Sequence, residues 1–176
     1  YGGTVSGTVL ANGSLKQEGS TGLVARARLN IDPNRRGVPV RGALNVSYDG
    51  RRDVIDVGQS AIALPSSRLE LSGSLGQQIA VRLTSRDLND FLPAIAAASQ
   101  QPPQPIPVRI LPGGAATVDA TVRGKVTSPA VDGHLSLTKF EASGRSFDLA
   151  AADINASENQ VVAENARVTK GSLRMD

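Results

Sequence analysis

The sequence predicts a mainly β fold in two sheet segments, separated by one short helix and a proline-rich connector. Three observations support this. Apolar and polar side chains alternate over most of the 176 residues, which is typical of half-buried strands. The 18 glycines recur inside these alternating runs, and aromatic residues make up only 3% of the chain. We expect the first sheet segment at 1–86, the helix and connector at 87–112, and the second segment at 113–176.

The first segment shows the alternation most clearly where one strand follows another. Leu44 and Val46 face one way, and Asp49-Gly50 then predicts a hairpin turn, because both residues tolerate positive φ. Further apolar positions of the same kind follow at Ile62, Leu64, Leu69, Leu71, Ile79, Val81 and Leu83. The segment therefore predicts several antiparallel strands joined by short turns.

The interruption at 87–112 begins with a change of period. Apolar side chains take the i, i+3, i+4 and i+7 spacing of a helix at Leu88, Phe91, Leu92 and Ile95. Asp87 is placed to cap this helix, and Pro93 predicts a short helix, a kink or two pieces. Five prolines between residues 100 and 112 then predict a stiff, extended connector.

Strand patterns return in the second segment. Apolar side chains alternate at Val118, Ala120 and Val122, and then at Leu135 and Leu137. Phe147 and Leu149 start another strand, which Ile154 continues. Residues 161–168 predict a further strand.

A short repeat of the form apolar-x-Gly-x-apolar occurs in both segments. Its five copies are 5–9, 40–44, 71–75, 122–126 and 131–135. Glycine inside a strand often marks a bulge or a sharp bend, and five such points predict a strongly curved sheet. The alternative is that these glycines simply end strands.

Catalysis finds little support in the composition. The chain has no cysteine and one histidine, His134, which we expect on a solvent-exposed sheet face with Ser136. The acid pairs Asp53/Asp56 and Asp87/Asp90 are expected at a strand start and a helix N-terminus. No nucleophile elbow or phosphate-binding loop is present. We predict that the protein is not an enzyme and binds no metal or cofactor.

The charge pattern also argues against a nucleic-acid partner. The net charge is only +3, and the adjacent basic pairs are Arg35-Arg36 and Arg51-Arg52. Few aromatic side chains are available to stack on bases. We therefore expect no nucleic-acid binding.

The apolar faces of the strands leave two arrangements open. Two sheets can bury these faces against each other as a sandwich. Alternatively, one curved sheet can form an open apolar groove, which needs an occupant because soluble proteins rarely expose large apolar patches. Long acyl chains suit walls of Leu, Val, Ile and Ala, and each buried CH₂ gains about 0.8 kcal/mol.

A family resemblance favours the groove. The segment 122–137 reads VRGKVTSPAVDGHLSL, and with the residues that follow it resembles the TamB-like proteins of the AsmA-like group of bacterial envelope proteins. The positions that match the family pattern are Gly124, Val126, Pro129, Gly133, Leu135 and Leu137. The resemblance is clearest over 122–173 and weaker over 1–86, and the helix and connector depart from the family pattern.

The resemblance implies a β-taco, a long curved β-groove that is open along one side and apolar inside. It implies phospholipid transport between the inner and outer membranes and a role in outer-membrane biogenesis and protein assembly. The expected partners are phospholipid acyl chains and, through the parent chain, an Omp85-type outer-membrane barrel protein (TamA-like). The expected location is the periplasm, with the chain a piece of a longer protein anchored in the inner membrane. The family brings no catalytic residues and no cofactor.

We therefore expect an open apolar groove formed by a strongly curved antiparallel sheet. The side chains predicted to line it are Leu44, Val46, Ile62, Leu64, Leu69, Leu71, Ile79, Val81, Leu83, Leu135, Leu137, Phe147, Leu149 and Ile154. The alternative is a non-catalytic β-sandwich or passenger-like module that binds another protein.

Overall fold

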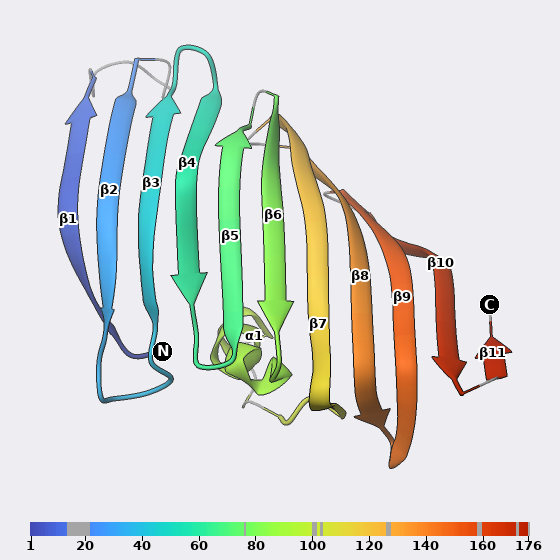
Figure 1. Cartoon of the computed structure of the whole chain (residues 1–176). Helices are drawn as coiled ribbons and strands as arrows, with labels where there is room; N and C mark the ends of the chain where they lie inside the picture. The colour runs from blue at the N-terminus through green and yellow to red at the C-terminus, as the bar shows by residue number, and fades with distance from the viewer. Residues whose placement is uncertain are drawn as a thin grey trace.

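The computed structural model describes residues 1–13, 22–75, 77–99, 102, 104–125, 128–157, 160–171 and 173–175. Within these ranges the chain forms one antiparallel sheet of eleven strands and one short helical segment (Figure 1). The strands follow chain order from β1 at one edge to β11 at the other. The predicted mainly β, antiparallel fold with one short helix is therefore confirmed, and the sheet is not closed.

The elements of the first half are β1 (Gly3–Asn12), β2 (Val24–Pro33), β3 (Arg41–Asp49), β4 (Val54–Ala63), β5 (Ser67–Ser74) and β6 (Gln78–Ser85). The 3₁₀ helix η1 (Leu88–Phe91) leads directly into α1 (Leu92–Ser99). The remaining strands are β7 (Val108–Lys125), β8 (Ser128–Ala142), β9 (Arg145–Ser157), β10 (Gln160–Lys170) and β11 (Leu173–Met175).

The connector ends earlier than the sequence predicts. β7 begins at Val108, so the last part of the proline-rich stretch lies inside a strand. Pro112 is accommodated because the register with β8 shifts between Ile110 and Ala115, and pairing with β6 begins only at Ala116. A residue without an N–H is tolerated where no ladder hydrogen bond is required. Since β6 pairs directly with β7, the two predicted segments form one sheet and the helix is an excursion from it.

The pairing register gives the sheet two distinct faces, because directly opposed residues of neighbouring strands point the same way. One cross-strand row is Val5, Ile31, Gly42, Ile62, Leu69, Leu83, Val118, Leu135 and Ala152. A second row on the same face is Val9, Ala27, Val46, Val57, Gly73, Ile79, Val122, Val131, Ala156 and Val161. We call the face that carries these rows the helix face, since the helical segment lies over it, and the other the back face.

Two repeat glycines lie beside irregularities in the ladder. Gly42 pairs next to the shift between Ala43 and Val46, and Gly73 pairs next to the shift between Val57 and Ser60. Gly73 has φ +117°, and a Cβ at this position would collide with the Gln78 carbonyl. Both shifts come from one extra residue of β4 between Val57 and Ala61, so the two glycines lie on the strands that pair with a single bulge in β4. A bulge bends and twists its strand locally.

The molecule has little interior. Its accessible surface is 11938 Å², whereas a compact monomer of this size exposes roughly 8,100 Å². The main buried cluster is Val57, Leu75 and Ile79, with Leu71, Val81 and their neighbours packed against it. The excess surface fits a single-layer sheet, so the described strands do not form the sandwich that the sequence left open.

Candidate apolar binding site

The helical segment starts as the sequence predicts. Asp87 is the N-cap of η1, and its Oδ1 accepts a hydrogen bond of 3.0 Å from the Asn89 amide. Pro93 is the second residue of α1, where a missing N–H costs nothing because first-turn amides have no partner within the helix. The segment accordingly forms two short helical pieces, η1 and α1.

A buried polar network fixes the first turn to the sheet. The Asp90 carboxylate, only 7% exposed, accepts hydrogen bonds of 2.8 Å from the Ser66 amide and from the Ser67 hydroxyl. Ser67 and the fully buried Ser85 lie 2.9 Å apart through their hydroxyl oxygens. The Tyr1 hydroxyl donates to the Asp90 carbonyl at 3.0 Å. These bonds hold η1 against the ends of β5 and β6.

A cavity of about 450 Å³ lies between this helical segment and the sheet. Its lining residues are Tyr1, Gly3, Val5, Ile31, Val40, Ile62, Leu64, Ser67, Leu69, Leu83, Phe91 and Ala94. This size falls in the range of small-molecule pockets. No charged side chain is among the described lining residues, and the two hydroxyls that line it, on Tyr1 and Ser67, already have partners.

Most of the predicted lining residues lie on the helix face. Ile62, Leu64, Leu69 and Leu83 line the cavity itself. The pairing places a further eight on the same face, away from the cavity: Leu44, Val46, Leu71, Ile79, Val81, Leu135, Leu137 and Ile154. The alternation of strands β3 to β9 brings these side chains together.

Phe147 and Leu149 are an exception and need a correction. Leu149 pairs with Thr138 and Thr169, one residue out of phase with Leu137, which pairs with Ala150. Strand alternation therefore puts Phe147 and Leu149 on the back face, an odd number of residues away from Ile154. Phe147 instead stacks on Phe140, with ring centroids 5.3 Å apart.

Sequence reasoning also missed part of the cavity wall. Val5 and Ile31 could have been predicted, because both lie in stretches with the same apolar-polar alternation as the predicted lining residues. Phe91 belongs to the predicted helix, but the helical spacing of its apolar residues does not predict which strands of the sheet it faces. Tyr1 and Ala94 carry no signal of their own, because only the folded chain brings them to the cavity.

The back face carries a row of ionisable side chains across β5 to β10. Its members are Glu70, Arg82, Asp119, His134, Asp153 and Glu164. Arg82 Nε lies 2.7 Å from Asp119 Oδ1, and His134 Nδ1 lies 2.7 Å from Asp153 Oδ1. These exposed pairs favour the observed strand register but contribute little individually.

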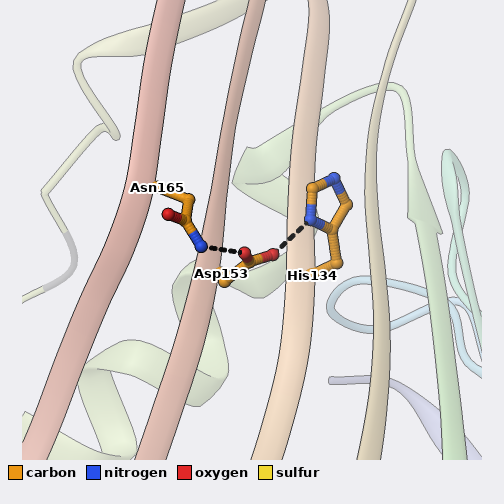
Figure 2. Close-up of polar contacts among 3 residues, drawn as sticks. All are labelled: His134, Asp153 and Asn165. Atoms are coloured by element: carbon orange, nitrogen blue, oxygen red, sulfur yellow. Dashed lines mark hydrogen bonds and ion pairs between the residues drawn. The ribbon is translucent and has the colours of Figure 1, made fainter. Parts of the chain in front are cut away.

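His134 lies on the exposed face where the sequence predicts it, with its side chain 52% exposed. Figure 2 shows Asp153 between His134 and Asn165, whose Nδ2 donates to Asp153 Oδ2 at 2.8 Å. The hydrogen bond with His134, followed by that with Asn165, lowers the pKa of Asp153 below its usual 3.8. The arrangement is a surface polar network outside the cavity.

The two acid pairs have separate positions. Asp53 lies in the turn before β4 with φ +52°, and Asp56 is an exposed residue of β4. Asp87 and Asp90 cap and anchor the helical segment. None of the four carboxylates lines the apolar cavity.

Among the described residues, no helix has the length and apolar character needed to cross a membrane. Comparison of the chain with protein-family models, with curated proteins and with solved structures found no match.

Proposed function

We propose that this chain is a segment of a lipid conduit, in which the helix face forms an open, curved apolar groove for phospholipid acyl chains. The observation that carries the proposal is the pair of aliphatic rows that cross the sheet from β1 to β9 and β10. Among the described elements, only η1 and α1 lie over this face. An aliphatic surface of this extent needs an apolar occupant.

The chemistry of the rows suits an acyl chain in particular. Their members are Val, Ile, Leu, Ala and Gly, so the surface offers no hydrogen bond that would hold a ligand in one place. Each methylene that leaves water gains about 0.8 kcal/mol wherever it lies along the row. Uniform, weak contact favours sliding, and the polar headgroup stays in water at the edge of the groove.

The resemblance to the TamB-like proteins supports the same proposal. The matching residues that the structure describes fall on one hairpin, where Gly124 pairs with Pro129 and Leu135 pairs with Val118. Val126, the remaining matching position, lies outside the described residues. A periplasmic location, an inner-membrane anchor on the parent chain, phospholipid transport, outer-membrane biogenesis and an Omp85-type partner are proposals that rest on this resemblance.

A second candidate function is non-catalytic binding of another protein along the edge of the sheet. The observation that favours it is β1, whose outer edge has no partner among the described strands. Its apolar side chains Val5, Val9 and Leu10 are 61%, 65% and 62% exposed. A free, apolar edge strand can add a strand from a partner.

Native mass spectrometry followed by lipid extraction tests the proposed function. We expect phospholipid to co-purify with the native chain and to be lost from Leu137→Asp, because a carboxylate on the helix face opposes acyl chains. Ser136→Asp is the matched control, since it places the same charge one residue away on the back face. A lipid-free native chain, or equal lipid loss from both variants, would contradict the conduit.

A further inference from the structure

The cavity beneath the helical segment differs from the rest of the helix face in having walls on two sides. Along the rows a ligand contacts one surface, but here Leu69 and Leu83 of the sheet face Phe91 and Ala94 of the helical segment across the same space. Contact on both sides removes more of a ligand's apolar area from water than contact with one wall. The cavity would therefore hold an acyl chain more tightly than the one-sided rows of the helix face do.

The polar groups around the cavity restrict what can enter it. Ser67 is committed to Asp90 and Ser85, and the Tyr1 hydroxyl is committed to the Asp90 carbonyl. A peptide backbone or a sugar inside would leave its own donors and acceptors unpaired. An aliphatic chain has none, so the lining is complementary to a saturated hydrocarbon.

The cavity opens on the side of β1. Tyr1 and Val5 line it, yet they are 50% and 61% exposed. Gly2, between the lining residues Tyr1 and Gly3, is fixed to the loop that follows β2: its N–H donates to the Val38 carbonyl at 2.7 Å. The Gly2 carbonyl in turn accepts from the Asn34 and Val40 amides at 3.1 and 3.0 Å. This loop is therefore the rim of the opening.

The rim is basic. Arg35 and Arg36 are adjacent and exposed in the loop, and the Arg36 carbonyl packs against Gly2. The acids nearest to the cavity wall in sequence are placed differently. Asp90 is buried in its serine network, and Asp32 and Glu70 lie on the back face, each one residue out of phase with a lining residue, Ile31 or Leu69. The opening thus combines an apolar interior with a positive edge.

We propose that this cavity is a holding site for a single aliphatic chain that carries an anionic headgroup, with the chain under η1 and α1 and the headgroup at Arg35 and Arg36. The inference rests on the proposed lipid function and deepens it. The helical segment adds a fixed site to an otherwise uniform groove.

Two probes with the same twelve-carbon chain test the assignment: dodecanoate, which is anionic, and dodecyl maltoside, which is neutral. Both are titrated below their micelle concentrations and followed by calorimetry and by amide NMR. We expect dodecanoate to bind more tightly, with shifts concentrated at Leu69, Leu83 and Ala94. Equal affinity for the two probes would contradict the proposed preference for an anionic headgroup.

Matched variants test each part of the site. Ala94→Phe fills the cavity and should weaken both probes about tenfold, the equivalent of roughly two displaced methylenes. Ala97→Phe, on α1 but not among the lining residues of the cavity, is its control. Arg35→Glu with Arg36→Glu should weaken dodecanoate alone by roughly tenfold. Arg51→Glu with Arg52→Glu, in the turn at the far end of β3, should leave both affinities unchanged.

The outcomes separate this site from the conduit as a whole. If the probes bind along the helix face and Ala94→Phe does not change their affinity, the holding site is overturned. That result would remain consistent with the conduit. Absence of binding at any position would contradict both. The chain could instead form a dimer, and dilution would then shift the NMR signals of the same cavity amides. That result would show that a second copy occupies the cavity, and it would also overturn the proposal.

Discussion

Asp90 shows how one residue links a surface loop to the candidate site. Its buried carboxylate accepts hydrogen bonds from the Ser66 amide and the Ser67 hydroxyl. Its carbonyl accepts a hydrogen bond from the Tyr1 hydroxyl. The sequence predicts only an acid near a helix start. Its role as an anchor depends on where the loop between β4 and β5 lies, and local spacing does not contain that information.

Replacement of this anchor should release the helical segment. Asp90→Ala leaves the Ser66 N–H and the Ser67 hydroxyl without their acceptor, which costs about 1–3 kcal/mol of unfolding free energy. Chemical denaturation measures the loss, and hydrogen exchange should show earlier opening of η1 and α1. The exposed Asp56→Ala is the control, with an expected change within about 0.5 kcal/mol. Equal stability of the two variants would contradict the anchor.

Asp153 gives a prediction about pH at the same scale. Its pKa in the folded chain is lowered, chiefly by the hydrogen bond with His134. A carboxyl with a depressed folded pKa stabilises the fold above its unfolded value near 3.8 and loses that contribution as the pH falls through the folded value. A carbon NMR titration should find the Asp153 midpoint below 3.8, and His134→Ala should raise it. A midpoint at or above 3.8 in the native chain would contradict the contact.

At the scale of elements, alternation predicts strands well where the ladder is regular. Ile79, Val81 and Leu83 fall on one face of β6, as the sequence indicates. The assignment of Phe147 and Leu149 to the groove is wrong because both lie an odd number of residues from Ile154, so strand alternation places them on the opposite face. The start of β7 is missed because prolines predict a connector, and the bulge that accommodates Pro112 is formed only against β8.

The edge strand β1 makes a prediction about association. Its outer edge, which has no partner among the described strands, and its exposed Val9 should promote contact between copies, because a free edge is a template for strand pairing. Val9→Lys should lower the association constant measured by sedimentation velocity, with little change in unfolding free energy. Ala97→Lys, on α1, should not have this effect. Association of the Val9→Lys chain at native strength would show that β1 is not the contact.

At the scale of the whole molecule, the described strands carry aliphatic rows on one face, part of which the helical segment covers, and a row of ionisable side chains on the other. The sequence predicts this division, since alternation assigns apolar and polar residues to opposite sides of each strand. It leaves the sandwich and the single sheet equally open, because both use the same pattern. The single sheet follows from pairing of each strand with its chain neighbour, and the large accessible surface reflects it.

The central claim is that lipid lies on the helix face and not on the back face. Val81 and Arg82 are adjacent in β6 and point to opposite faces, so they form a matched pair for a photo-activated cross-linking amino acid. Irradiation in cells, followed by mass spectrometry of the purified chain, measures phospholipid attached at each position. The account predicts attachment from position 81 and almost none from position 82. Equal attachment from both positions, or attachment from position 82 alone, would contradict it.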